Sequence, residues 1–424
     1  MTATEAAQWC GGRRWGGDPI LTGVCIDSRQ ARGGDLFVAL PGAHTDGHQF
    51  ITAAAGSGAV AAMVSESSIN NAGVARIVVG DCGEALRRLA ATWRLRFTGT
   101  LIAITGSNGK TTVKEMLASI CRAAAGEAQV HHSSGNFNNR LGVPLSLLGL
   151  RVRHHLAVLE AGMDAPGELR ELGRLLRPQV VVINNVMRAH LGGFNSLAEI
   201  AAAKGELLES LPANGTAVLN ADDVHLPLWK KLAGARRVLT FGFGDAADYR
   251  GAWQNGVLHL PTGEAVTLQT AGAHNANNAL AAAAAATVLN LSPPAIIAGL
   301  AEFEGVVGRL QFIQCGNWLI IDDSYNANPD SVLAALAVLA AQAGEKIAVL
   351  GDMLDLGTAA ADAHRQVLAA ATDAAIEVFS VGEHFGMAGS TQHFADKEAL
   401  LKSLRSRLGG RTAALLVKGS RGMG

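Results

Sequence analysis

Apolar runs alternate with segments of helical periodicity along most of the chain. Between about residues 98 and 305 the runs "LIAIT", "HLAVLE", "QVVVINN" and "GTAVLN" are followed by segments with apolar positions three and four apart. Buried parallel strands form such continuous apolar runs, and strand-helix alternation is typical of a doubly wound parallel sheet. We therefore predict an α/β protein with this sheet at its centre.

The flanking segments predict two further α/β units. Residues 1–97 contain "LFVAL", "AAMVS" and "RIVVG" and end in the helical segment "DCGEALRRLAATWRLRF". Residues 306–424 contain "NWLIIDD", "KIAVLGD", "IEVFSVG" and "ALLVKGS", which predict a Rossmann-like sheet. The polar stretch from about 240 to 272 is expected to add a small β excursion. Three domains suit a length of 424 residues.

Composition narrows the class of protein. Hydrophobic residues make up 49% and charged residues 17% of the chain, and the formal net charge is −1, so we expect neither disorder nor nucleic-acid binding. The five cysteines form no C-x-x-C pair, and the histidine doublets lack zinc-like spacing. The sequence has no export segment and no run of about 18 apolar residues. We expect a soluble cytoplasmic protein with no membrane insertion and reduced thiols.

The strongest chemical signal is "ITGSNGKTTVKE", a glycine-rich turn between an apolar run and a helical segment. Its candidate phosphate-binding residues are Gly106, Ser107, Asn108, Gly109, Lys110, Thr111 and Thr112. Backbone N–H groups and the helix N-terminus would face the phosphates, the lysine would add charge, and the threonine hydroxyl can bind Mg²⁺. Ile104 departs from the common G-x-x-x-x-G-K-[ST] pattern, so an ordinary helix-capping turn is the alternative.

Polar residues follow the expected strands, at the sheet edge where such folds bind ligands. They are Glu160, Asn184, Asn185, Asp322, Asp323, Asp352 and Lys418, and we expect an active site between the two sheets to collect them. Glu160 suits either a Mg²⁺ ligand or a loop cap. His190 suits either a metal ligand or a structural histidine.

Lys204 lies on the apolar stripe of its expected helix, because its neighbours four before and four after are Ile200 and Leu208. The side chain either extends along the apolar surface to reach water or is buried with a lowered pKa. A buried neutral amine can react with CO₂ to form a carbamate, an acid-like group able to bind a metal.

The asparagine-rich segments are similarly ambiguous. In "SSGNFNNRLGVPLSLL" the amides of Asn136, Asn138 and Asn139 either stabilise turns or bind a polar substrate. Those of "GAHNANNALAAAAAA" either cap a helix or contact a purine edge. In "DDSYNANPDSV" we expect Asn328 to be the N-cap of a helix that begins at Pro329.

Taken together, these segments resemble the Mur ligase family of ATP-dependent amide-forming enzymes over nearly the whole chain. The matching motifs, in order, are "IDSRQARGGDLFVALPGAHTDGHQFI", "TGSNGKTT", "GNFNN", "GVPLSLL", "RAHLGGF", "AKGE", "HNANNALA", "DDSYNANPDS", "LGDMLDLG" and "VKGSRG". The chain is most similar to members that add D-alanyl-D-alanine to UDP-N-acetylmuramoyl-tripeptide through an acyl phosphate. This implies a UDP-sugar-binding domain at 1–97, an ATP-binding domain at 98–305 and a ligase domain at 306–424.

The resemblance also implies residue roles. Lys110 would contact the ATP phosphates, Thr111 and Glu160 would bind one Mg²⁺, and His190 with carbamylated Lys204 would support a second. ATP would also contact Asn275, Asn278, Asp323 and Arg309. Substrate contacts would come from Ser28, Arg29 and Asp46 in the UDP region, and from Asn138, Asn139, Asn326 and Asn328 in the acceptor and dipeptide region. We expect a monomer.

Three departures from the family pattern and two alternatives qualify this interpretation. "INNVMRAHL", which includes Asn185 and Met187, differs from the usual "ITNIGRAHL"; "LEAGM" replaces "EMG"; and the chain ends at Gly424, where relatives continue into a helix, so we expect a shortened third domain. A folylpolyglutamate synthetase would lack the uridine-type "IDSRQARGGDLFVAL", and a non-catalytic UDP-sugar-binding relative would not need Lys110 or Lys204. The absence of N-K-x-D argues against a P-loop GTPase. Meso-diaminopimelate and L-lysine both remain open as the third residue of the tripeptide.

Overall fold

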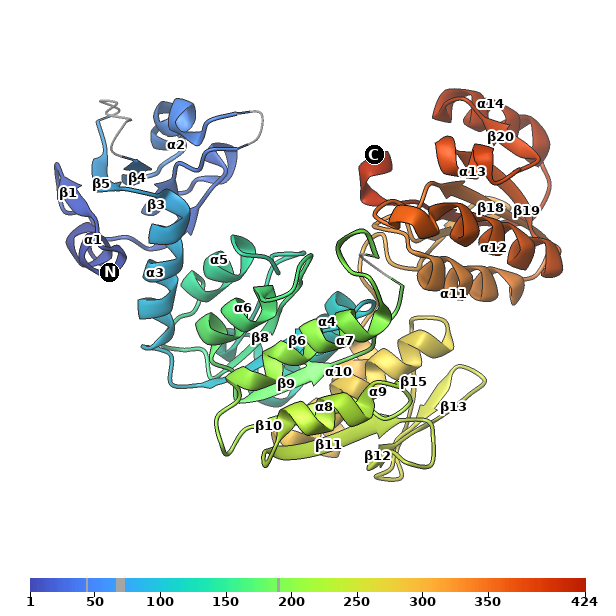
Figure 1. Ribbon diagram of the computed structural model, residues 1–424, viewed down its shortest axis with the longest axis horizontal. Coiled ribbons are helices and arrows are strands. Elements are labelled where there is room, and N and C mark those ends of the chain that lie inside the picture. The colour runs from blue at the N-terminus through green and yellow to red at the C-terminus, as the bar shows by residue number, and fades with distance from the viewer. Residues whose placement is uncertain (43–44, 66–72, 189–190) are drawn as a thin grey trace.

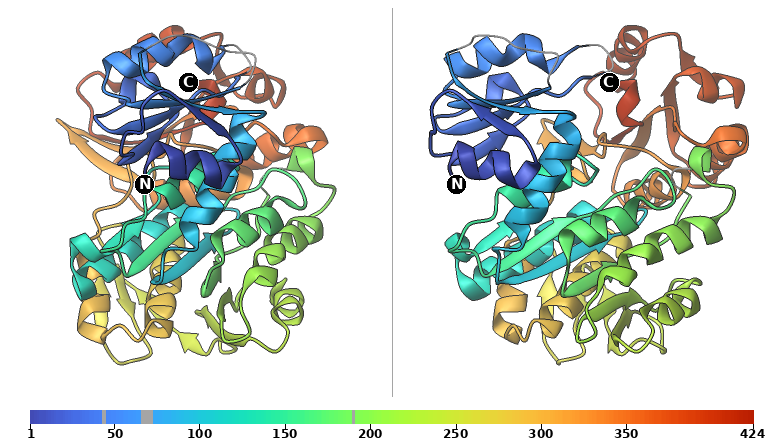
Figure 2. Two further views of the ribbon diagram at one scale, coloured as in Figure 1. Left: turned by 90° about the vertical axis from the view of Figure 1, so that its left-hand side faces the viewer. Right: turned by 60° about the vertical axis from the view of Figure 1, so that its left-hand side comes forward.

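The computed structural model describes residues 1–42, 45–65, 73–188 and 191–424 and contains three α/β units. Figure 1 shows the N-terminal and C-terminal units as two arms on the central unit. Both arms rise from the same side of the central unit in the further views of Figure 2. The predicted α/β class with three domains is confirmed.

The N-terminal domain has a five-stranded sheet in the order β1-β5-β4-β3-β2, with β1 antiparallel to β5 and the other pairs parallel. Its strands are β1 (Arg13–Trp15), β2 (Gly23–Cys25), β3 (Asp35–Val38), β4 (Ala61–Ser65) and β5 (Ala75–Val79). Its helices are α1 (Ala3–Cys10), α2 (Ile51–Gly56) and α3 (Cys82–Arg94), with 3-10 turns η1 (Ser28–Gln30) and η2 (Gly47–Phe50). The three predicted strands and the predicted helix are therefore present.

The central domain has a parallel seven-stranded sheet in the order β12-β11-β10-β9-β6-β8-β7. Its strands are β6 (Thr100–Thr105), β7 (Val130–His132), β8 (Leu156–Glu160), β9 (Val180–Ile183), β10 (Thr216–Asn220), β11 (Arg237–Gly242) and β12 (Tyr249–Arg250). After β6 the chain forms β7 and β8 on one side of that strand and then crosses to its other side as β9. Such a switch point is where doubly wound sheets bind ligands at the carboxyl ends of their strands.

Helices cover both faces of this sheet. One face carries α5 (Gly142–Leu148), α6 (Glu168–Leu176), α7 (Leu197–Gly205) and α8 (Leu226–Ala233), and the other carries α4 (Lys110–Ala125), α9 (Ala273–Val288) and α10 (Pro293–Glu302). The predicted β excursion is an antiparallel sheet of β13 (Ala252–Gln254), β14 (Val257–His259) and β15 (Ala265–Thr267). The 3-10 turns are η3 (Glu127–Gln129), η4 (Leu191–Gly193) and η5 (Glu206–Ser210).

The C-terminal domain has a six-stranded sheet in the order β16-β17-β21-β18-β19-β20, in which only β16 is antiparallel to its neighbour. Its strands are β16 (Gln311–Cys315), β17 (Trp318–Asp322), β18 (Glu345–Gly351), β19 (Glu377–Val381), β20 (Gln392–Phe394) and β21 (Ala413–Lys418). Its helices are α11 (Pro329–Ala340), α12 (Ala360–Asp373), α13 (Glu383–Met387) and α14 (Lys397–Leu408), with 3-10 turns η6 (Gly357–Ala359) and η7 (Arg421–Met423). The four predicted strands are β17, β18, β19 and β21.

One hydrophobic core continues from the N-terminal domain into the central domain. It joins Ile77 of β5 to Leu86 of α3 and to Leu101 of β6. Trp93 of α3 also donates a hydrogen bond to the Leu150 carbonyl of the central domain at 3.1 Å. The core of the C-terminal domain is separate, and Ala271 is the residue from outside that domain that packs against it in the described part of the chain. Helix α3 therefore joins the first two domains through apolar packing, whereas the third domain has its own core.

Candidate active site between the central and C-terminal domains

The turn between β6 and α4 is held in shape by asparagines that follow β9. Asn185 accepts the Ser107 N–H through its carbonyl and the Asn108 N–H through Oδ1, both at 2.9 Å. Asn184 Nδ2 donates to the Asn108 carbonyl at 2.9 Å. Gly109 has φ +78°, and a methyl group there would lie 2.2 Å from Asn278 Oδ1. The turn is thus a preformed loop at the N-terminus of a 16-residue helix, an arrangement that suits a phosphate.

Lys110 is the first residue of α4 and folds back over this turn. Its Nζ donates to the carbonyls of Gly106 and Ser107 at 2.9 and 3.1 Å. Burial lowers the pKa of Lys110, and the nearby Glu160 carboxylate opposes that shift. The ammonium is therefore held by neutral acceptors beside the loop, where a phosphate could bind it more strongly.

Glu160, at the end of β8, is 1% exposed and forms the centre of a polar cluster. Its Oε2 accepts the Thr111 hydroxyl at 2.7 Å, and its Oε1 accepts Asn138 Nδ2 at 2.6 Å. Arg309, from the segment before β16, donates to the same Thr111 oxygen at 2.9 Å. A carboxylate and a hydroxyl beside a phosphate-binding loop are the oxygen ligands that Mg²⁺ prefers.

The C-terminal domain adds a second charged cluster to the site. Lys418, at the end of β21, is 4% exposed and donates to Asp323 Oδ2 at 2.5 Å and to the Asn326 carbonyl at 2.8 Å. Burial raises the pKa of Asp323 and lowers the pKa of Lys418, and the attraction between the two charges opposes both shifts. The Arg309 guanidinium lies 4.0 Å from the centre of the Tyr325 ring. These contacts orient the arginine toward Thr111.

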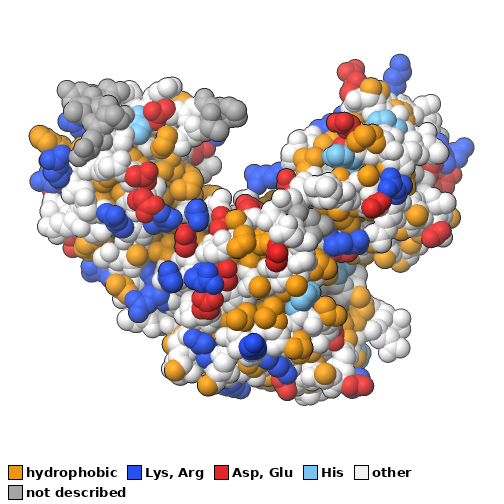
Figure 3. Space-filling model, in the orientation of Figure 1, with side chains coloured by type: hydrophobic (Ala, Val, Ile, Leu, Met, Phe, Trp, Pro, Cys, Tyr) orange, Lys and Arg blue, Asp and Glu red, His pale blue; other side chains and the backbone are white. Residues whose placement is uncertain are grey.

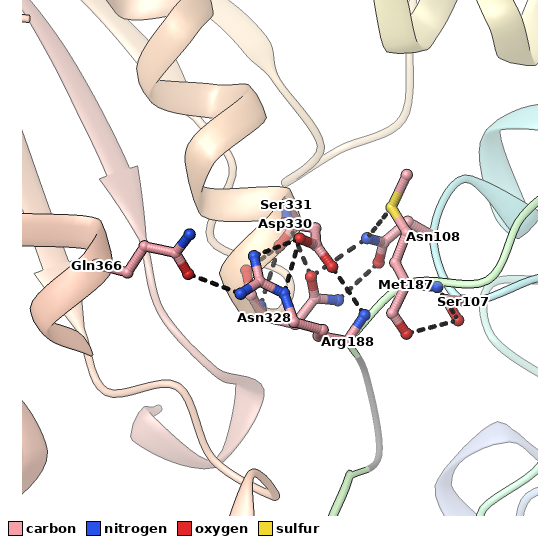
Figure 4. A network of polar contacts seen from close by, with 8 residues as sticks. All are labelled: Ser107, Asn108, Met187, Arg188, Asn328, Asp330, Ser331 and Gln366. Atoms are coloured by element: carbon pink, nitrogen blue, oxygen red, sulfur yellow. Dashed lines mark hydrogen bonds and ion pairs between the residues drawn. The ribbon is translucent and has the colours of Figure 1, made fainter. Parts of the chain in front are cut away.

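Figure 4 shows a polar network that connects the phosphate-binding loop to the start of α11. Asn108 and Asn328 pair through their side-chain amides, with Asn328 Nδ2 2.7 Å from Asn108 Oδ1. Arg188 donates to Asp330 Oδ1 through Nη2 at 2.6 Å and through Nε at 3.0 Å. It also donates to Gln366 of α12 at 2.6 Å. The central and C-terminal domains therefore meet here through hydrogen bonds and an ion pair.

These elements enclose a cavity of about 390 Å³. Its lining includes Asn108, Lys110, Asn136, Asn138, Glu160, Asn185, Met187, His274, Asn275, Asn278, Arg309, Asp323, Tyr325, Asn326, Asn328 and Lys418. In the space-filling view of Figure 3 the molecule is hollowed between the two arms, above the central domain. The volume and the mixture of amides and cations suit a nucleotide-sized polar ligand.

The first turn of α9 brings amides to one side of this cavity. Asn278 Oδ1 accepts Asn184 Nδ2 at 2.8 Å, and Asn278 Nδ2 donates to Asn275 Oδ1 at 3.2 Å. Both α9 asparagines are 5% exposed. The neighbouring His274 has its pKa lowered to about 4 by burial and by the charge on Lys418, so its ring is neutral at pH 7. The amides form a buried network that begins at the phosphate-binding loop, which is more than helix capping requires.

Lys204, near the end of α7, is 2% exposed. Burial and the charge on Lys110 lower the pKa of Lys204 well below its usual value. Within the ranges that the structure describes, no group of three or more His, Cys, Asp or Glu residues could hold a metal ion. A buried amine of this kind is chemically suited to carbamate formation. His190 lies outside the described residues.

Comparison with known proteins assigns the chain to a family. The Mur ligase family catalytic domain matches residues 20–94, the Mur ligase middle domain matches residues 104–286, and the Mur ligase glutamate ligase domain matches residues 308–421. The chain belongs to the Mur ligase family. Among curated members, UDP-N-acetylmuramoyl-tripeptide--D-alanyl-D-alanine ligase of Escherichia coli (strain K12) is 39% identical over 437 residues, covering 99% of this chain and 96% of that protein.

Solved Mur ligase structures have the same fold. MurF from Acinetobacter baumannii has a TM-score of 0.87 at 33% identity, and the alignment covers 100% of this chain and 96% of that one. MurF ligase from Thermotoga maritima in complex with ADP has a TM-score of 0.79 at 26% identity, with 95% and 94% of the two chains covered. In the described part of this Mur ligase, no helix has both the length and the apolarity needed to span a bilayer.

The N-terminal residues implied by the family resemblance lie away from the cavity. Ser28 and Arg29 form η1 after β2, and the Arg29 side chain is 86% exposed and paired with Asp27 at 2.7 Å. Asp46 follows β3 and accepts His48 Nδ1 at 2.6 Å, while His48 Nε2 accepts the Ser65 N–H at 3.0 Å. These residues gather at the carboxyl-end edge of the N-terminal sheet, and none of them lines the 390 Å³ cavity.

Two sequence-predicted asparagines serve the backbone. Asn139 Oδ1 accepts the N–H groups of Leu141 and Gly142, and Asn139 does not line the cavity. Asn328 is the N-cap of α11, as expected, because its Oδ1 accepts the Ser331 N–H at 2.9 Å, yet its Nδ2 also reaches Asn108. Asn139 therefore behaves as a turn residue, whereas Asn328 is both a cap and a cavity residue.

The expectation that all strand-end polar residues converge was only partly correct. Glu160, Asn185, Asp323 and Lys418 line the cavity, and Asn184 supports the loop from behind. Asp352 instead accepts the N–H groups of His384 and Phe385 at the start of α13. Asp322 accepts the Ser324 N–H in a local turn. The last two side chains satisfy nearby backbone donors, which a strand-end position cannot reveal.

Sequence reasoning did not single out several cavity residues, and three of them have clear contacts. His274 precedes the α9 asparagines, Tyr325 supports Arg309, and Asn220 ends β10 with Nδ2 donating to the Asn184 carbonyl at 2.8 Å. The strand-end position of Asn220 was the available signal. The departure at Met187 also has a local consequence, because its sulfur accepts Asn108 Nδ2 at 3.1 Å and its side chain lines the cavity.

Proposed function

We propose that this Mur ligase is an ADP-forming ligase that joins D-alanyl-D-alanine to UDP-N-acetylmuramoyl-tripeptide with ATP. The observation that carries the proposal is the cavity lined by Lys110 and Glu160 of the central domain and by Arg309 and the Asp323–Lys418 pair of the C-terminal domain. Thr111 is hydrogen bonded to both Glu160 and Arg309. Full-length similarity to curated ligases of this name, at 39% identity for the Escherichia coli protein, supports the choice of substrates.

The three substrates divide among the three domains. We assign UDP-sugar binding to residues 1–97, ATP binding to residues 98–305 and dipeptide binding to residues 306–424. Ser28, Arg29 and Asp46 would hold the UDP part at the edge of the first sheet. Asn138, Asn326 and Asn328 line the cavity and would contact the acceptor peptide and the dipeptide, whereas Asn139 shapes the turn beside them. The hollow between the arms supports a bridging substrate that reaches from the first sheet to the phosphate-binding loop (Figure 3).

ATP would bind in the 390 Å³ cavity. Gly106, Ser107, Asn108, Gly109 and Thr112 would surround the phosphates, and Lys110 would exchange its loop carbonyls for phosphate oxygens. Asn275 and Asn278 would face the adenine, while Asp323 would accept a ribose hydroxyl. Arg309 already reaches Thr111 across the domain boundary, so it would add positive charge at the transferring phosphoryl group.

The oxygen donors fit a magnesium ion. Thr111 and Glu160 would bind one Mg²⁺, which supplies electrostatic stabilisation of phosphate charge when bound. His190 and a carbamate on Lys204 would hold a second ion. The buried Lys204 amine supports that part of the proposal because its pKa is strongly lowered.

The chemistry follows from the inertness of a carboxylate toward an amine. The γ-phosphoryl group passes to the terminal carboxylate of the tripeptide, which gives an acyl phosphate and ADP. The dipeptide amine then attacks the acyl carbon, an amide bond forms and phosphate leaves. Positioning and charge stabilisation by Lys110 and Arg309 promote the first step, and the C-terminal domain excludes water from the acyl phosphate.

Product analysis tests the proposal. ATP, Mg²⁺, D-alanyl-D-alanine and UDP-N-acetylmuramoyl-tripeptide, with meso-diaminopimelate or L-lysine as third residue, are mixed with the protein and each component is omitted in turn. We expect phosphate release and a UDP-linked pentapeptide, identified by mass, only in the complete mixture. Binding of ATP and the UDP substrate without any product would instead indicate a non-catalytic relative.

The carbamate is tested separately. Lys204→Ala should abolish ligation. Bicarbonate cannot restore activity, because the variant lacks the amine on which a carbamate forms. A short carboxylate such as acetate or formate should restore part of the rate by occupying the space of the carbamate. Lys231→Ala, on the exposed surface of α8, is the control and should retain wild-type activity. Full activity of Lys204→Ala without any addition would remove the carbamate from the proposal.

A further inference from the structure

Lys114 is a fully buried lysine on the same helix as the phosphate-loop lysine. It is 0% exposed and is one of the largest fully buried side chains of the protein. Its Nζ lies 2.6 Å from the Ser133 carbonyl, 3.2 Å from the Gly135 carbonyl and 2.7 Å from Glu115 Oε1. An ammonium has three N–H donors, so each has an acceptor. Lys114 does not line the cavity in which we place the nucleotide.

Two of these acceptors belong to the segment that carries Asn138. Between β7 and α5 the chain forms turns and neither a helix nor a strand, so its position depends on individual hydrogen bonds, among them Gly162 N–H to the Asn138 carbonyl at 2.8 Å. Ser133 is attached to β8 on its other side, since its N–H donates to the Val158 carbonyl and its hydroxyl accepts the Glu160 N–H, both at 3.2 Å. Lys114 therefore fixes the segment against α4.

The contacts form a closed circuit around the Glu160 carboxylate. Starting from α4, Thr111 contacts Glu160, and Glu160 contacts Asn138. The chain then runs back from Asn138 to Ser133 and Gly135, which are bound to Lys114 on α4. Thr111 and Lys114 are three residues apart and so lie on neighbouring parts of one helical turn. Release of Lys114 would free one side of this circuit and let the Asn138 amide move away from the carboxylate.

We propose that Lys114 is a positioning residue that holds the 133–139 segment in place, so that Asn138 orients Glu160 for the phosphoryl-transfer step. This inference rests on the function proposed above. It differs from a role in stability alone, in which Lys114 would be a buried cation neutralised by Glu115. The two roles can be tested separately, because the ion pair with Glu115 neutralises the charge of Lys114, whereas the hydrogen bonds to the Ser133 and Gly135 carbonyls hold the segment in position. Glu115 itself lies partly in water, with 22% of its side chain exposed.

The experiment compares Lys114→Met, Lys114→Gln and Glu115→Gln in the full-length protein. Lys114→Met removes all three donors, Lys114→Gln keeps a neutral donor, and Glu115→Gln leaves both carbonyl bonds intact. Because a displacement of about 1 Å can reduce a rate about 100-fold, we expect kcat of Lys114→Met to fall about 100-fold. Its KM for ATP should stay within about threefold of wild type, since the nucleotide contacts remain. Lys114→Gln should retain an intermediate kcat, and Glu115→Gln should keep kcat within about threefold while losing thermal stability.

Amide hydrogen exchange gives a readout that does not depend on turnover. Exchange over residues 133–141 should be faster in Lys114→Met and unchanged in Glu115→Gln. Equal exchange and equal kcat in Lys114→Met and wild type would overturn the proposal, as would equal losses of kcat in Lys114→Met and Glu115→Gln. If circular dichroism showed that neither Lys114 variant folds, Lys114 would be a determinant of the fold and the proposal would be rejected. Failure of wild type to form the pentapeptide would reject the proposed function. The exchange comparison would still test whether Lys114 holds the 133–139 segment in place.

Discussion

Gly109 is the position at which one methyl group should do the most damage to nucleotide binding. The residue has φ +78°, and an added Cβ would lie 2.2 Å from Asn278 Oδ1 and 2.6 Å from Asn184 Nδ2. Those two atoms are hydrogen bonded to each other at 2.8 Å. Gly109→Ala therefore forces the pair apart or forces the loop away from it.

The size of the effect follows from two contributions. An alanine in the left-handed region costs about 1–2 kcal/mol. Separation of the buried Asn184 and Asn278 amides leaves polar atoms without partners and costs about 1–3 kcal/mol more. The loop can relieve this strain by leaving its native shape, but ADP binding requires that shape. Since about 1.4 kcal/mol changes an affinity tenfold, the lower sum of about 2 kcal/mol predicts that the Kd for ADP rises at least about 30-fold.

Isothermal titration with ADP and Mg²⁺ measures this change. Gly126→Ala at the other end of α4 is the matched control, because Gly126 has φ +88° but no atom lies within 4 Å of an added Cβ. That variant should lose thermal stability through the backbone conformation alone, by about 1–3 kcal/mol, and keep the wild-type Kd. An ADP Kd within about threefold of wild type in Gly109→Ala would refute the reasoning that the contact with Asn184 and Asn278 shapes the site.

Three further predictions concern other parts of the molecule. Arg188→Ala removes charge-assisted hydrogen bonds to Asp330 worth about 1.5–3 kcal/mol, so small-angle scattering without nucleotide should show a more extended particle. An unchanged radius of gyration would contradict a role for the Arg188–Asp330 contact in holding the two domains together. Arg29→Ala should raise KM for the UDP substrate at least about tenfold and leave KM for ATP unchanged, because Arg29 lies outside the cavity; equal effects would contradict its assignment. Burial lowers the pKa of His131 from 6.5 to about 4, so the unfolded chain binds a proton between these pH values that the folded chain does not. The contribution of His131 to the free energy of unfolding should thus be complete above pH 6.5 and fall as pH decreases toward 4, by up to about 1.4 kcal/mol per pH unit. Urea titrations should show a shallower fall in His131→Gln, and an identical slope would count against His131 as the cause.

The elements that the sequence predicted are those with long apolar runs. β6, β8, β9 and β10 are buried on both faces, so their sequences are apolar throughout and easy to recognise. β16 was missed because it is an edge strand with four of its five residues exposed, and "QFIQC" lacks a clear buried face. β7 and β20 have three residues each and present no measurable period. The proposed domain boundaries at 97/98 and 305/306 remain predictions.

Local patterns located the phosphate-binding loop, but they could not reveal contacts between domains. The Arg309–Thr111 hydrogen bond joins residues 198 positions apart, and the Arg188–Asp330 contact joins residues 142 apart. Such contacts depend on how two separately folded sheets are oriented, and neither the period of a strand nor the cap of a helix encodes that orientation. The hydrogen bonds from the His384 and Phe385 N–H groups to Asp352 are also set by tertiary packing, here within one domain.

The hydrophobic core shared by the first two domains fixes the position of the N-terminal arm relative to the central domain. Moving that arm would expose the apolar surface of α3 to water, at about 25 cal/mol for each Å². At the C-terminal arm, hydrogen bonds such as Asn108–Asn328 can be exchanged for bonds to water or to a ligand. Under the function proposed above, a substrate anchored on the N-terminal sheet would be presented to the phosphate-binding loop at a set distance, which would select peptides of matching length. Under the same proposal, opening of the cavity for nucleotide would fall to the C-terminal arm, whose contacts with the central domain are polar.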